Sequence, residues 1–112
     1  MVEIEVRRII ALETLRPFTP ETIEQVAALL QIMRDRCPIP DVDKGYWSTI
    51  SFHWHETSRG PTEIEVFGDR IEFYRYRDQH TEMEEYAQKP GEQFSEAILS
   101  ELPTAVASPD TP

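Results

Sequence analysis

Three short segments in the middle of the chain alternate between apolar and polar residues, at positions 50–55, 62–66 and 71–76. A repeat of two residues predicts β-strands that each have one apolar and one polar face. Residues 56–61 connect the first two segments. Gly68-Asp69 joins the second to the third, and a leading glycine suits a two-residue type II′ turn. These short connections predict an antiparallel meander.

A helix is predicted to precede the meander. Thr19 is a suitable N-cap, and Pro20 fits the first helical position. The pair Cys37-Pro38 ends the pattern, because a residue before proline avoids helical backbone angles. Apolar residues at helical spacing predict the face that packs on the sheet: Ile23, Val26, Ala27, Leu30 and Met33.

The remaining segments complete an expected α+β fold. Residues 2–6 alternate strictly and predict a strand that runs to about Ile10 and pairs at either edge of the meander. Residues 41–45 read as a turn-rich connector, and residues 78–91 as a loop or short irregular helix. A second amphipathic helix is expected over about 92–102. The prediction is one α+β domain, residues 1–102, with an antiparallel sheet of three to four strands, two amphipathic helices packed on it, and a disordered tail over 103–112.

The charge of the chain limits its partners. Twenty-one acidic and eleven basic residues give a net charge of −10, which repels a phosphate backbone and favours basic protein partners. The single cysteine, Cys37, forms no internal disulfide framework and predicts a reducing compartment. Neither a signal peptide nor a membrane-spanning run is recognisable. We therefore expect a cytoplasmic protein that binds neither nucleic acid nor membrane directly and needs no cofactor.

The polar face of the meander carries the residues most suited to metal binding. With a hairpin centred near Arg59, His53 would face Glu65, and His55 would face Glu63. Two histidines and a carboxylate are ligands for zinc or a similar ion, so His53, His55 and Glu65 form a candidate metal site. The alternative is a solvated sheet face with simple His–Glu pairs.

The leading hypothesis is a small non-catalytic interaction module: an adaptor, inhibitor or accessory subunit. No nucleophile, phosphate-binding or dinucleotide motif is present, so no enzymatic activity is expected. Tyrosine and tryptophan are enriched at protein interfaces. The predicted contact surface consists of Trp47, Glu63, Glu65, Glu72, Tyr74 and Tyr76. A second apolar layer, in which the C-terminal helix covers this face, is the alternative. The other partner that the pattern allows is a second copy of the chain, paired through a free sheet edge.

A run of acidic residues offers another hypothesis. Glu82, Glu84 and Glu85 lie close together in sequence, and mimicry of a phosphate backbone would make the chain an inhibitor of a nucleic-acid-handling protein, perhaps of phage origin. A solvated face explains the same run.

A helix is followed by the connector Pro38-Ile39-Pro40, Gly45, a strand ending in Trp54, and the paired strands of residues 63–76. In this order of features the middle of the chain resembles small uncharacterised proteins of bacterial accessory and phage-associated genomes. The resemblance covers about half of the chain and implies no activity.

Overall fold

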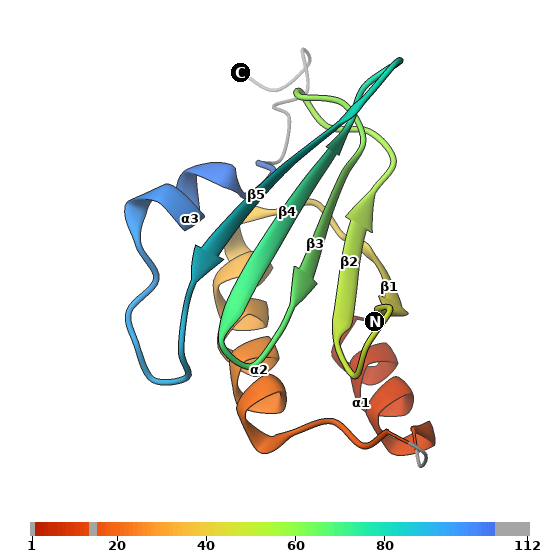
Figure 1. Cartoon of the computed structure of the whole chain (residues 1–112), viewed down its shortest axis with the longest axis vertical. Coiled ribbons are helices and arrows are strands. Elements are labelled where there is room, and N and C mark those ends of the chain that lie inside the picture. The colour runs from red at the N-terminus through yellow and green to blue at the C-terminus, as the bar shows by residue number, and fades with distance from the viewer. Residues whose placement is uncertain (1, 14–15, 105–112) are drawn as a thin grey trace.

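The computed structural model describes residues 2–13 and 16–104. Three helices and five strands follow the chain in the order α1 (Val2–Leu12), α2 (Pro20–Arg36), β1 (Asp41–Lys44), β2 (Ile50–Trp54), β3 (Thr62–Val66), β4 (Arg70–Tyr76), β5 (Thr81–Ala87) and α3 (Glu96–Glu101). The strands form one antiparallel sheet in chain order, β1-β2-β3-β4-β5 (Figure 1). The α+β class is confirmed, with a larger sheet and one helix more than predicted.

All three helices contribute to one core on a single face of the sheet. Val6 of α1, Leu29 of α2 and Ile98 of α3 belong to the same buried cluster as Phe52 and Phe73 of the sheet. Figure 1 shows the sheet in front of the helices. The opposite face, called the outer face below, has no helix of the described chain against it. The alternative in which the C-terminal helix covers this face is therefore wrong.

The predicted N-terminal strand is a helix, and this prediction was wrong. Residues 2 and 6 are four apart, so they share a face in a helix as well as in a strand, and the short alternation fits both periods. Val6 is buried, and Glu5 forms an ion pair of 2.8 Å with Arg8 one turn later. A second ion pair, 3.0 Å from Glu3 to Arg34, joins α1 to α2.

The second helix begins and ends as predicted. The Thr19 hydroxyl accepts a hydrogen bond from the Thr22 amide, Pro20 is the first residue, and Cys37 is the C-cap. Its buried face is rotated from the predicted stripe: Val26 and Met33 are buried, but Ile23 is 39% exposed. The buried Gln25 amide instead donates to the carbonyls of Phe67 and Gln88, at 3.3 and 2.6 Å.

The two edge strands fall where none was predicted. Residues 41–45 were predicted as a connector and residues 78–91 as a loop or short irregular helix, and both predictions were wrong. β1 pairs with β2 and places Val42 opposite Phe52, while β5 pairs with β4 along its whole length. The Tyr86 ring packs edge-on against Phe73 with centroids 5.7 Å apart. Both strands are rich in charged residues, which is common at sheet edges because charge blocks pairing with another chain.

The turn at Gly68 keeps the predicted register but not the predicted type. Glu65 faces Glu72 and Glu63 faces Tyr74, as expected. Gly68 lacks the positive φ that a type II′ turn needs. A methyl group there would lie 3.1 Å from Cβ of Glu21, so the backbone of this turn packs closely against α2.

The last helix is shorter than predicted. α3 begins after its N-cap Ser95, whose hydroxyl accepts from the Ile98 amide at 3.2 Å. The predicted tail falls mostly on residues 105–112, outside the described residues. Pro103, at its start, is buried.

Candidate functional site

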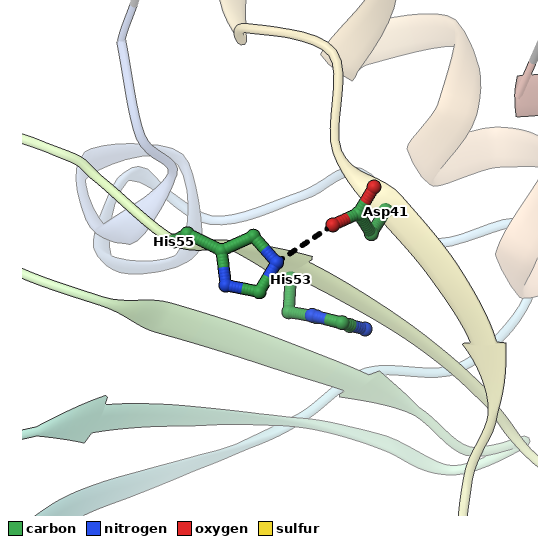
Figure 2. A group of neighbouring side chains, drawn as sticks. All are labelled: Asp41, His53 and His55. Carbon is green, nitrogen blue, oxygen red and sulfur yellow. Dashed lines mark hydrogen bonds and ion pairs between the residues drawn. The ribbon is translucent and has the colours of Figure 1, made fainter.

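Two histidines and two aspartates meet where β1 and β2 lie side by side on the outer face. Asp41 faces His53 across the ladder, and Asp43 faces Ser51. Nε2 of His53 lies 2.8 Å from Oδ2 of Asp43, and Nε2 of His55 lies 2.8 Å from Oδ2 of Asp41. Figure 2 shows the His55 ring turned towards Asp41, with His53 beside it. We call these four residues the His/Asp cluster.

The geometry of the cluster fits a metal ion better than the predicted combination does. One nitrogen of each histidine and one carboxylate oxygen of Asp41 lie within 4.8 Å of one another. The two imidazole rings are perpendicular, with centroids 5.6 Å apart. Most of the cluster is open to solvent, since 79% of the His55 side chain and 62% of the Asp41 side chain are exposed.

Glu65, the predicted third ligand, lies elsewhere. The β2–β3 hairpin is centred at Ser58 rather than Arg59, so its register differs by two residues and His53 faces Glu63. Glu65 faces Ser51 and accepts a hydrogen bond from the Thr49 hydroxyl. A shift by two keeps each side chain on its face but changes its partner.

Glu65 and Glu72, predicted as contact residues, are buried although they lie on the outer face; they are 8% and 7% exposed. Glu72 accepts from the Tyr74 hydroxyl and, at 2.9 Å, from Nε of Arg70. Burial raises the pKa of the Glu72 carboxyl, but these two hydrogen bonds, together with the charge of Arg70 and a hydrogen bond with Glu85, hold the pKa below its usual 4.5. Both glutamates support the outer face and offer little surface of their own.

The two predicted tyrosines also make hydrogen bonds within the sheet. The Tyr76 hydroxyl donates to Glu63 at 3.1 Å, and Tyr74 is half-buried. Burial and the neighbouring Glu63 raise the pKa of Tyr76 to about 12, so its hydroxyl stays protonated at neutral pH. Tyr76 is 42% exposed and remains available for contacts.

The most exposed aromatic residues lie in the loop between β1 and β2. Tyr46 is 81% exposed and Trp47 54%, and their rings meet edge to face with centroids 5.0 Å apart. We call residues 45–49 the aromatic loop. It contains the predicted Trp47, whereas Tyr46 was not selected from the sequence.

Hydrogen bonds fix the aromatic loop to the body of the protein. Nζ of Lys44 donates to the Trp47 carbonyl at 3.0 Å, and the Ser48 hydroxyl donates to the Arg16 carbonyl at 2.6 Å. The Gly45 amide donates to the Thr49 carbonyl at 2.8 Å. The loop therefore presents its two rings from a held backbone.

Gly45 makes room for the buried carboxylate beneath this loop. A methyl group at Gly45 would overlap the Thr49 hydroxyl and lie 2.5 Å from Oε2 of Glu65. The closeness of the backbone to Glu65 thus depends on the absence of a side chain at Gly45.

The acidic run of β5 does not form one acidic face. Glu82 and Glu84 point to the core side of the sheet, whereas Glu85 shares the outer-face row of Glu72. Glu82 is paired with Arg77 at 2.8 Å, and Glu85 lies 3.5 Å from Nε of Arg70. Strand geometry divides the run, which removes the continuous charge that mimicry of a phosphate backbone would use.

A half-open apolar cavity of about 310 Å³ lies between the start of α1 and the end of α2. Its lining includes Leu30, Met33, Cys37 and Ile39. Burial raises the pKa of the Cys37 thiol to about 11. Since the thiolate is the reactive form, this cysteine is poorly suited to nucleophilic chemistry.

Asp41 and Asp43 are the site residues that the sequence analysis missed. They alternate around Val42 as His53 and His55 alternate around Trp54, and that shared period was the available signal for two paired strands. A short segment with one apolar residue gives a weak strand pattern.

Among the described residues, none of the helices has the length and apolar character that a membrane crossing requires. No protein-family model, curated protein or solved structure matches the chain.

Proposed function

We propose that this chain is a non-catalytic protein-interaction module whose principal contact is the aromatic loop. The observation that carries the proposal is the exposed Tyr46–Trp47 pair on a fixed backbone. Tryptophan and tyrosine dominate the energetics of protein interfaces when a partner pocket buries them. Burial of these exposed rings against a partner removes apolar surface from water, and this contributes free energy of binding.

Preorganisation of the loop strengthens this interpretation. Binding costs free energy when mobile side chains and loops become ordered. The bonds from Lys44, Ser48 and Gly45 already hold the loop, so little ordering remains for the complex. Glu65 contributes to recognition through its hydrogen bond from Thr49 and not through direct contact.

The surroundings of the loop specify the chemistry of the partner. A shallow groove beside Trp47 is lined in part by Glu21, Phe67 and Asp69, and both acidic residues are exposed. With a net charge of −10 for the chain, the complementary surface is an apolar pocket with a basic rim. Tyr76 and Glu63 lie further along the outer face and make secondary contacts with the partner.

The absence of catalytic arrangements supports a binding role. In the described part of the chain, the His/Asp cluster lies on an open sheet face, and the enclosed part of the apolar cavity contains no activated nucleophile. Catalysis by general acids and bases needs a site that excludes water. The lone Cys37 thiol suits the reducing cytoplasm, which we propose as the location.

Affinity capture with purified tagged protein tests the proposal, with nuclease present and at two salt concentrations. The double variant Tyr46→Ala/Trp47→Ala should lose the stoichiometric partner that the parent protein retains. Ile39→Ala is the matched control, because Ile39 is 86% exposed and lies beside the separate apolar cavity. Equal capture by the double variant and by the parent protein would refute the proposal.

A further inference from the structure

We propose that Asp41, His53 and His55 bind a divalent transition-metal ion such as Zn²⁺ on the outer face of β1 and β2. Two imidazoles and one carboxylate form a donor set that suits zinc and its neighbours in the transition series. The three donor atoms lie within 4.8 Å of one another. This site is separate from the aromatic loop and does not depend on its function.

Strand pairing brings these donors together. Asp41 and His53 are direct partners in the β1–β2 ladder, and His55 follows two residues later, just beyond the end of β2. The backbone positions are therefore set by sheet hydrogen bonds before any ion binds. Only side-chain rotation remains, and the exposure of Asp41 and His55 lets both rotate with few contacts to lose.

The donor atoms lie at separations on both sides of the spacing that a bound ion requires. Zinc binds nitrogen and oxygen at about 2.0–2.2 Å, which places two ligand atoms of a tetrahedral site about 3.3 Å apart. Nε2 of His55 and Oδ2 of Asp41 are 2.8 Å apart around a shared hydrogen. An ion takes the place of that hydrogen, and the ring proton moves to Nδ1 of His55.

Asp43 supplies the outer partner that metal-binding histidines commonly have. An ionised carboxylate can only accept, so Nε2 of His53 carries the hydrogen that points to Asp43 at 2.8 Å. In the neutral ring this leaves Nδ1 with a free lone pair. A carboxylate held in this way fixes the tautomer and makes the other nitrogen a better ligand. Three protein ligands leave the remaining position of a tetrahedral ion open to water.

Titration of the purified protein with zinc, monitored by calorimetry near pH 7, tests the site. We expect one ion per chain, with affinity reduced more than about tenfold in His53→Ala and in His55→Ala, since each loses a direct ligand. Asp43→Asn should weaken binding by about tenfold or more through its outer hydrogen bond. His80→Ala is the matched control, because the third histidine of the chain is exposed in the β4–β5 turn.

Two additional readouts keep the test decisive. The melting temperature of each metal-free variant should match that of the parent protein. Asp41→Asn changes a ligand at an exposed position and therefore carries little risk to folding. The visible spectrum of bound Co²⁺ should change in the His53 and His55 variants but not in His80→Ala. The site is refuted if the parent protein binds no zinc, or if the control loses as much affinity as the ligand variants.

Discussion

The β1 edge and the β5 edge of the sheet, called the β1 side and the β5 side below, pair their acidic residues with different partners. Near β5, glutamates are paired with arginines: Glu72 and Glu85 with Arg70, and Glu82 with Arg77. Near β1, the partners are two histidines for Asp41 and Asp43, and a hydroxyl for Glu65. Arginine is always protonated, so these three glutamates keep a charged partner at every physiological pH. Histidine and hydroxyl partners can be exchanged, which leaves the β1 side able to bind a ligand.

The largest expected effect comes from breaking an arginine–glutamate pair on the β5 side. Arg75 of β4 reaches Glu101 of α3, with Nη2 3.0 Å from Oε2, and both side chains are 15% exposed. Arg75→Met leaves the Glu101 carboxylate with only the more distant Arg59, at 3.8 Å, and should lower the free energy of unfolding by about 3 kcal/mol. Urea denaturation measures the loss. The double change Arg75→Met/Glu101→Leu should recover most of it, and an equally unstable double variant would show that the charge is not the cause.

A smaller effect is expected when the β1 side is disturbed at Gly45. Gly45→Ala places a methyl group against Thr49 and Glu65, and we expect a loss of about 2 kcal/mol from overpacking. The fluorescence of Trp47 and Trp54 should also change, because the backbone of the loop has to move. Gly91→Ala meets nothing within 4 Å but has a φ of +85°, so it shows the cost of a strained backbone without a clash, for comparison with the clash at Gly45. Unaltered stability of Gly45→Ala would contradict the close packing over Glu65.

The pH dependence of Glu72 distinguishes a compensated carboxylate from an exposed one. Its pKa is lower in the folded chain than the usual 4.5, so ionised Glu72 stabilises the fold above that pH. This stabilisation is lost as the pH falls from about 4.5 through the folded pKa. The stability difference between the parent protein and Glu72→Gln should therefore shrink over that range. A difference that stays constant in urea titrations between neutral and acidic pH would contradict the assignment.

The smallest effect is expected at the exposed edge of β5. Glu85→Gln removes one member of a 3.5 Å pair whose glutamate is 53% exposed, and the free energy of unfolding should change by no more than about 0.5 kcal/mol. Zinc binding at the His/Asp cluster should be unchanged by it. A clear loss of zinc affinity in calorimetry would mean that the two sides of the sheet are coupled.

The sequence predicts the middle of this fold well because two signals agree there. In β2, β3 and β4 the alternation of apolar and polar residues is long enough to set strand type and face, and α2 has both an N-cap and a proline stop. Residues 2–6 are too few to separate a period of 2 from one of 3.6, and the packing of Val6 decides for a helix.

The site was harder to predict than the fold, because it depends on register and on an edge strand. Residues 41–44 contain one apolar side chain, so their alternation marks only weakly the strand β1 that carries Asp41 to His53. The centre of the β2–β3 hairpin lies one residue earlier than expected, which moves Glu65 away from the histidines. The candidate histidines could be selected by their spacing, but their carboxylate partners required the structure.

Site-specific photo-crosslinking tests most directly whether the β1 side, and not the β5 side, is the functional surface. A photoreactive phenylalanine analogue at Trp47 is compared with the same residue at Met83, which is 44% exposed on β5. We predict one specific adduct from position 47, competed away by unlabelled parent protein but not by Tyr46→Ala/Trp47→Ala, and none from position 83. An adduct from position 83 alone, or equal labelling at both positions, would contradict the account.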